Sequence, residues 1–126
     1  MFKGFVNKSS IPYILSKSSI NILNYSQTQY NWTRGNSSNK LFEYMASGKP
    51  IISTVKMGYS IIGKYNCGIE LDSCTANDLA KAILQVKNMP VEHYMIITAN
   101  AKQGVKDFDF KNLTQKLVNV IASVHK

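Results

Sequence analysis

Cysteine is scarce in this sequence, with Cys67 and Cys74 as the only two. Two cysteines are too few for a disulfide framework, and no paired Cys or His spacing suggests zinc, so we expect two free thiols, with Cys67 packed as a small apolar residue, and no metal site. Long apolar runs are missing too, since no segment approaches the roughly 18–20 residues of a membrane helix. The start, Met1-Phe2-Lys3-Gly4, lacks the layout of a signal peptide. We therefore predict a soluble, cytoplasmic chain.

Acidic residues are nearly missing from the first half. Residues 1–64 contain eight basic residues and one acid, Glu43, whereas residues 65–126 contain seven basic and six acidic residues. A basic half attracts phosphates, nucleic acid or an anionic membrane surface, although lysines scattered over solvated faces by an Asn-, Lys- and Ile-rich composition would look the same. Arginine is represented only by Arg34, and no ladder of alternating aromatic and basic residues is present, which argues against nucleic acid as a partner.

Apolar periodicity predicts alternating strands and helices in one domain of ordinary size. Strands are expected at 4–6, 20–25, 51–55 and 68–71, and helices at 9–17, 39–47, 75–86, 91–107 and 111–125. Ser10 and Thr75 are expected to cap two of these helices, and Gly48 is expected to end a third. The order of elements predicts an α/β fold, a partial Rossmann-like domain with about four strands in a mainly parallel sheet and flanking helices.

The junction between a long polar loop, residues 26–38, and the helix from 39 suggests a ligand site. Backbone N–H groups at such a helix start bind phosphate, and Lys40 adds a full positive charge. Glu43, one turn further along, could accept hydrogen bonds from a ribose diol. The alternative is an ordinary surface pair between Lys40 and Glu43. Neither a GxGxxG nor a P-loop fingerprint is present.

Residues 39–52, NKLFEYMASGKPII, resemble the signature of the large retaining glycosyltransferase family with the GT-B fold, and look closest to its capsule and lipopolysaccharide branch. Short flanking pieces agree in order and spacing, namely 4–6 with 11–12, then 67–69, 79–83, 100–101 and 108–109. The resemblance implies that residues 1–126 form one partial Rossmann-like domain, the C-terminal part that binds the nucleotide-diphospho-sugar donor as substrate. It implies no cofactor and no metal.

The resemblance also carries site residues. Glu43 matches the second glutamate of the family's E-x7-E motif, which holds the ribose hydroxyls, while the first glutamate falls at Gly35 and is absent. Backbone N–H groups at the helix tip would bind the diphosphate, and the residues after the first strand would contact the base more weakly. The donor-binding set is Ser38, Asn39, Lys40, Leu41 and Glu43, and the base-contact set is Val6, Asn7 and Lys8. No residue matches a catalytic position, and His93 and His125 match none.

Two further βα units and the whole acceptor domain of the family have no counterpart in the sequence. We interpret the chain as a truncated gene product, a fragment or a split subunit, whose partners include the missing acceptor domain or subunit. The alternatives are a non-catalytic nucleotide-sugar-binding partner or remnant, and a basic α/β domain that docks on anionic membrane. We also expect peripheral contact with the inner face of the membrane, and self-association through a helical stripe of Leu113, Leu117, Ile121 and Val124 with Val118 beside it, or through a free sheet edge.

Overall fold

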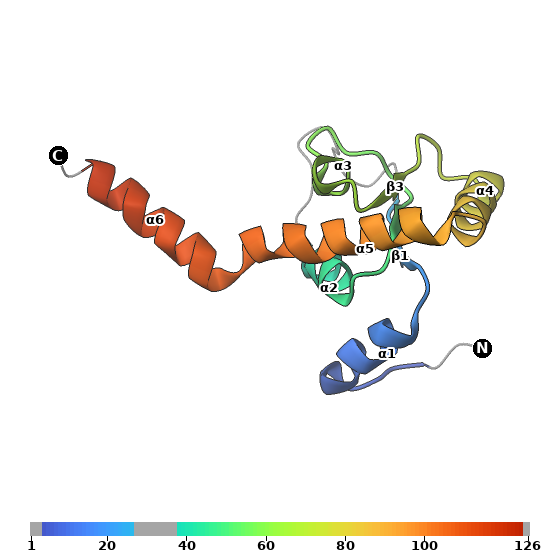
Figure 1. The fold of residues 1–126 in the computed structure, drawn as a ribbon, viewed down its shortest axis with the longest axis horizontal. Helices are drawn as coiled ribbons and strands as arrows, with labels where there is room; N and C mark the ends of the chain where they lie inside the picture. Colours follow the sequence, from blue (N-terminus) through green and yellow to red (C-terminus); the bar gives the residue numbers. More distant parts are fainter. Residues whose placement is uncertain (1–3, 27–37, 125–126) are drawn as a thin grey trace.

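The computed structural model describes residues 4–26 and 38–124, and Figure 1 shows the C-terminal helix projecting from the rest of the chain, with the N-terminal helix also set apart. Its elements follow in the order η1 (Lys8–Ser10), α1 (Ile11–Lys17), β1 (Asn21–Leu23), α2 (Asn39–Ser47), β2 (Ile51–Ser53), α3 (Ile61–Tyr65), β3 (Gly68–Glu70), α4 (Ala76–Lys87), α5 (Val91–Val105), η3 (Lys106–Phe108) and α6 (Phe110–Val124). The predicted alternation of strands and helices is thus confirmed as an α/β fold.

The three strands form one parallel sheet in the order β1-β2-β3. Ile52 of β2 lies opposite Ile22 on one side and Ile69 on the other. The predicted parallel pairing is confirmed, but the prediction of about four strands is wrong for the part of the chain that the structure describes. Residues 4–6 do not form a strand: Gly4 has a left-handed φ of 70°, and the Phe5 side chain is fully exposed. A strand needs a neighbour to pair with, and a three-residue apolar pattern does not supply one.

β2 is buried on both faces, as its continuous apolar character predicts. On one face, Ile51 joins a core cluster with residues of α2, α3 and α5, including Met45 and Ala101, both 0% exposed. On the other face, Ile52 packs against α4 through Ala82 and Val86. The apolar side of α4 therefore covers this face of the sheet. The result is a sheet between two helical layers.

Helix ends follow the sequence signals in two cases out of three. Gly48 ends α2 in the left-handed conformation, with φ 66°, and the Thr75 hydroxyl accepts a hydrogen bond from the Asp78 backbone N–H at the start of α4. The expected cap by Ser10 is wrong. Ser10 itself has helical dihedral angles because the 3-10 turn η1 runs directly into α1, so its side chain makes no cap hydrogen bond.

A short helix that we did not predict, α3, is capped by Ser60 and buries Ile61 and Ile62 against the first core cluster. At the other end of the chain, α6 leaves the body without burying any of its residues (Figure 1). Within the described residues, no helix combines the length and the apolar character that crossing a membrane requires.

Candidate functional site

A chain of hydrogen bonds at the carboxyl edge of the sheet places the start of α2. Just beyond β2, the Thr54 backbone N–H donates to the Leu23 carbonyl over 3.0 Å, and the Thr54 hydroxyl accepts from the Tyr25 N–H over 2.8 Å. The Tyr25 hydroxyl in turn shares a hydrogen bond of 2.6 Å with the Ser38 hydroxyl. The first turn of α2 therefore lies at the edge where open α/β sheets bind their ligands.

The tip of α2 offers backbone N–H groups but not all four that the sequence suggested. The Leu41 N–H donates to the Ser38 carbonyl over 3.0 Å, and the Leu41 side chain is 1% exposed in the core. Asn39 and Lys40 are exposed first-turn residues, whose N–H groups have no carbonyl one turn earlier within the helix. Ser38 stands at the N-cap position without capping the helix, because its hydroxyl bonds to Tyr25 instead.

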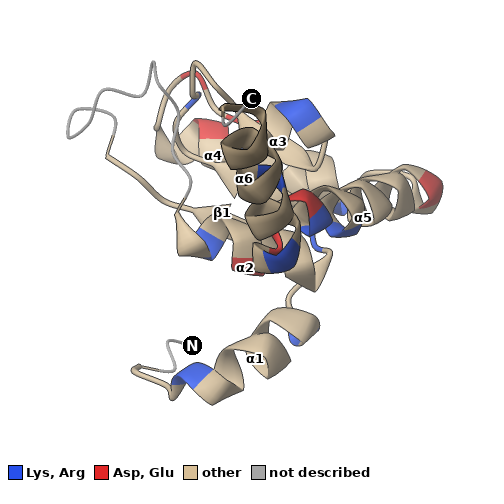
Figure 2. Cartoon of the chain, turned by 90° about the vertical axis from the view of Figure 1, so that its left-hand side faces the viewer, with Lys and Arg blue, Asp and Glu red and all other residues tan. Residues whose placement is uncertain are grey.

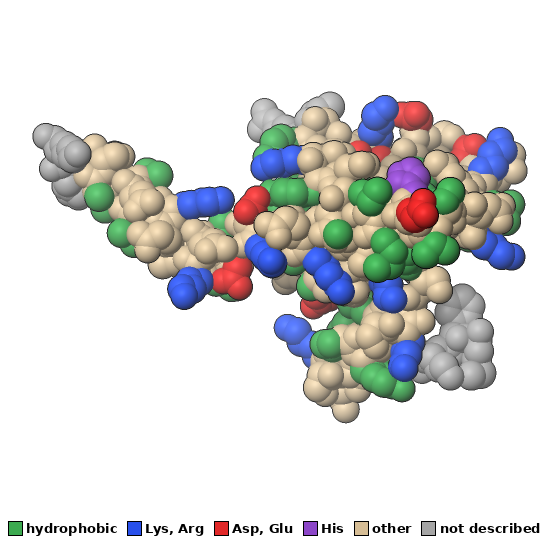
Figure 3. All heavy atoms as spheres, in the orientation of Figure 1, with side chains coloured by type: hydrophobic (Ala, Val, Ile, Leu, Met, Phe, Trp, Pro, Cys, Tyr) green, Lys and Arg blue, Asp and Glu red, His purple; other side chains and the backbone are tan. Residues whose placement is uncertain are grey.

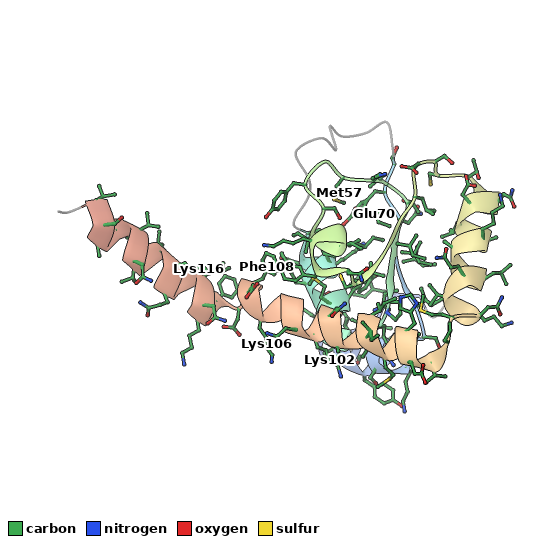
Figure 4. All side chains as sticks on the ribbon, turned by 45° about the horizontal axis from the view of Figure 1, so that its top comes forward. Met57, Glu70, Lys102, Lys106, Phe108 and Lys116 are labelled. Atoms are coloured by element: carbon green, nitrogen blue, oxygen red, sulfur yellow. The ribbon has the colours of Figure 1, made fainter. Side chains whose placement is uncertain are left out.

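Glu43 lies in the wall of a cavity of about 430 Å³ between α1 and α2. Most of the apolar lining comes from α1, with Ile11, Pro12 and Leu15, and α2 adds Ala46. Lys8 lines the same cavity from the turn before α1. A further basic residue, Lys102, lines it from α5 and is labelled in Figure 4. The cavity thus combines one carboxylate, two ammonium groups and an apolar wall.

Glu43 and Lys8 also line a second cavity of about 640 Å³, together with Asn39. Its other walls are aromatic and aliphatic and come from distant parts of the sequence: Phe42, Phe108, Phe110 and Leu113. The Phe42 and Phe108 rings pack with centroids 4.7 Å apart, which joins α2 to η3 (Phe108 is labelled in Figure 4). Glu43 consequently lies between the two cavities, one beside α1 and one beside the start of α6.

Glu43 is half-buried and lies outside both core clusters. It does not pair with Lys40: the salt bridge found among the described residues joins Lys56 and Asp72 over 3.1 Å. The neighbouring Tyr44 has its pKa raised, first by burial and then by the nearby Tyr25 and by the negative charge of Glu43. A carboxylate without an ion-pair partner, facing two cavities, has its oxygens available to accept hydrogen bonds from a ligand.

The remaining predicted site residues differ in whether they line the cavities. Lys8 lines both of them, but Val6 and Asn7 line neither, and Lys40 is exposed on α2 outside both walls. Figure 2 shows basic residues on both α1 and α2. Gly35, where the family's first glutamate would fall, lies outside the described residues.

Sequence reasoning missed the residues that build the site from a distance. Tyr25 and Thr54 hold the helix tip, and no local pattern marks them, since each simply follows a strand. Phe108 and Phe110 are separated from Glu43 by more than sixty residues of sequence, and only the path of α5 across the sheet brings them together. Across residues 4–26 and 38–124, no cluster of three or more His, Cys, Asp or Glu side chains is arranged to hold a metal ion.

No protein-family model, curated protein or solved structure matches this chain.

Proposed function

We propose that this chain binds the nucleoside diphosphate of a sugar nucleotide beside Glu43 and forms the donor-binding portion of a retaining glycosyltransferase. The observation that carries the proposal is the position of Glu43: an available carboxylate one turn from a helix tip, at the carboxyl edge of a parallel sheet, between two cavities that Lys8 also lines. The resemblance of residues 39–52 to the family signature supports the same assignment.

Each part of the ligand has a chemically suited counterpart. The diphosphate would lie at the N–H groups of Asn39 and Lys40, where the helix dipole favours an anion. The Lys8 ammonium would add a positive charge beside it. The ribose hydroxyls would donate to the Glu43 carboxylate. The base would fit the cavity between α1 and α2, because its walls are largely apolar there.

The chemical contribution of such a site is electrostatic. When a glycosyl group leaves a nucleoside diphosphate, negative charge develops on the diphosphate, and fixed N–H dipoles and ammonium groups stabilise it. The acceptor and any group that activates it would come from a separate domain or subunit. His93, the histidine that the structure describes, is exposed at the start of α5 and lines neither cavity.

Ligand-observed NMR with a panel of UDP-, GDP- and dTDP-sugars tests the proposal. We expect saturation transfer to at least one donor, with the strongest transfer to its ribose and base protons, and displacement by the matching nucleoside diphosphate. The free sugar should not displace it. The absence of saturation transfer to every member of the panel would refute donor binding by this chain.

A further inference from the structure

The Lys102 side chain lies against the end of α2. A Cβ atom at position 48 would lie 3.1 Å from both Cγ and Cδ of Lys102, and it would overlap Cε. The glycine that ends α2 in the left-handed conformation therefore also leaves room for this lysine. Lys102 lines the cavity between α1 and α2, so α5 brings an ammonium group to that cavity (Lys102 is labelled in Figure 4).

The two serines of the cavity wall already donate their hydroxyl protons to backbone carbonyls. The Ser16 hydroxyl donates to the Tyr13 carbonyl over 2.7 Å, and the Ser47 hydroxyl donates to the Tyr44 carbonyl over 2.7 Å. The Ser47 oxygen also accepts from the Asn21 side-chain amide over 2.9 Å. Among the described lining residues, the side-chain donors left for a ligand are therefore the two lysine ammonium groups, and an ammonium group only donates.

Lys102 is the charged lining group to which the proposed function gives no part of the ligand. In that function Glu43 accepts from the ribose hydroxyls, Lys8 lies beside the diphosphate, and the base lies in the cavity. Lys102 forms no ion pair with another described residue, so its N–H groups are available to the base. The inference that follows rests on the proposed function.

An ammonium group favours a base that offers acceptor atoms and few donors. Uracil and thymine each have two carbonyl oxygens and a single ring N–H. Adenine has an exocyclic amino group and no carbonyl, and guanine adds an amino group and a ring N–H to its one carbonyl. These extra donors would lack a charged acceptor, since the carboxylate of the cavity is already engaged with the ribose. The lysine therefore favours uracil and thymine.

We propose that Lys102 selects the base and that the donor of this site is a uridine diphosphate sugar. Uracil and thymine differ by one methyl group, but the sugar nucleotides of thymidine carry 2′-deoxyribose. The Glu43 carboxylate accepts from both hydroxyls of a ribose diol and from only one hydroxyl of deoxyribose. Glu43 thus favours the ribonucleotide, Lys102 favours the base, and uridine diphosphate satisfies both.

The charge around the cavity suits any nucleoside diphosphate. Figure 3 shows basic side chains on both sides of the junction between α1 and the rest of the chain. Lys8 and Lys102 line the cavity from different elements, η1 and α5. Attraction by the total charge raises the affinity of every nucleoside diphosphate alike. The preference for one base over another therefore isolates the contact between Lys102 and the base.

Calorimetric titration of the full chain with uridine, 2′-deoxyuridine, guanosine and adenosine diphosphates tests the inference. Because Lys102 is exposed, we expect the lower end of the range for hydrogen bonds to charged groups, which is about tenfold in affinity. Uridine diphosphate should bind about tenfold more tightly than adenosine diphosphate. Guanosine and 2′-deoxyuridine diphosphates should also bind more weakly than uridine diphosphate.

Lys102→Met keeps an unbranched chain beside Gly48 and removes the ammonium group. It should weaken binding of uridine diphosphate about tenfold and leave adenosine diphosphate unchanged. Tm should stay nearly constant, because methionine and lysine have similar helix propensities. Lys106→Met is the matched control, since Lys106 is exposed one turn further along the chain and lines neither cavity. It should bind all four nucleotides as the wild type does.

Equal affinity of the wild type for uridine and adenosine diphosphates would overturn base selection while leaving donor binding intact. Equal weakening of both nucleotides by Lys102→Met would place the ammonium at the diphosphate and would also overturn it. So would a loss of affinity in Lys106→Met that matches the loss in Lys102→Met. Binding of 2′-deoxyuridine diphosphate as tight as that of uridine diphosphate would overturn the choice of the ribonucleotide. Absence of binding by all four would refute the proposed function, and this inference with it.

Discussion

Replacing Gly104 with alanine should destabilise the protein, although alanine is the better helix former. A Cβ atom at position 104 would lie 2.6 Å from the Cγ and Cδ1 atoms of Tyr65 and 3.0 Å from the Cε of Met45. The Met45 methyl group can turn aside, but the Tyr65 ring is held at both ends. Its hydroxyl donates to Asp107 over 2.6 Å, and its ring makes a T-shaped contact with the Phe108 ring, with centroids 5.9 Å apart.

The magnitudes of three opposing effects decide whether Gly104→Ala stabilises or destabilises the protein. Alanine gains about 1 kcal/mol over glycine within a helix. Overpacking of a filled site costs about 1–3 kcal/mol, and moving the ring away weakens a hydrogen bond that contributes about 0.5–1.5 kcal/mol. We expect Gly104→Ala to lower the free energy of unfolding by about 1–2 kcal/mol, which corresponds to a fall of several degrees in Tm.

Urea denaturation followed by circular dichroism measures this change. Ala99→Gly, at an exposed position of the same helix, calibrates propensity alone and should cost about 1 kcal/mol. Both substitutions should therefore lower the free energy of unfolding, although helix propensity alone predicts that Gly104→Ala raises it and Ala99→Gly lowers it. In a Tyr65→Ala background the clash is gone, and Gly104→Ala should become stabilising. Stabilisation of the wild-type background by Gly104→Ala would refute the close packing of α5 against α3.

Three further predictions concern the thiols, a helix cap and the charge distribution. Burial raises the pKa of the Cys67 thiol from an ordinary 9.0 to about 11, so a thiol reagent should label only Cys74 in the native protein and both cysteines after denaturation. Rapid labelling of both thiols in the native protein would contradict the burial of Cys67. The thiol of the unfolded chain ionises at lower pH than the buried thiol, so the stability that depends on Cys67 burial is complete below about pH 9 and is lost as the pH rises toward 11. Thr75→Ala removes the acceptor for the Asp78 N–H and should cost about 1 kcal/mol in thermal unfolding, and an unchanged Tm would argue against the cap. The basic first half should bring weak binding to anionic vesicles, with about 1 kcal/mol from each basic residue near the surface before screening. Salt should reverse this binding, and no co-sedimentation at low salt would favour scattered lysines over a docking face.

The elements that sequence predicted well are those whose local signals agree with their tertiary environment. Ile51 and Ile52 read as a strand buried on both faces, and Gly48 ends the preceding helix, because apolar character and glycine chemistry act over a few residues. Phe5 shows the limit of this reasoning, since a short apolar segment forms a strand only if a neighbouring strand accepts it. α3 was not predicted for a related reason: the Ser60 cap and two isoleucines form a stable helix only where the rest of the fold buries the isoleucines.

The candidate site divides in the same way. The sequence suggested the helix tip and Glu43 because the phosphate and ribose contacts proposed for them depend on residues within one turn. It did not suggest the walls of the two cavities, since α1, α5 and η3 contribute residues far apart in the sequence. Tyr25 and Thr54 act through hydrogen bonds that exist only once β1 and β2 have paired. Local chemistry suggested the centre of the candidate site, and the fold adds the cavity walls around it.

Calorimetric titration of wild type, Glu43→Gln and Glu92→Gln with the nucleotide sugar that NMR selects tests the central claim most directly. Glu92 is an exposed glutamate at the start of α5, outside both cavities, and controls for the loss of one negative charge. A hydrogen bond to a charged acceptor contributes about 1.5–3 kcal/mol, so Glu43→Gln should weaken binding by roughly 10- to 100-fold while Tm stays nearly constant. Glu92→Gln should bind as wild type does. Equal affinity of Glu43→Gln and wild type would remove Glu43 from the site, and no binding by the wild-type chain would contradict the proposed function itself.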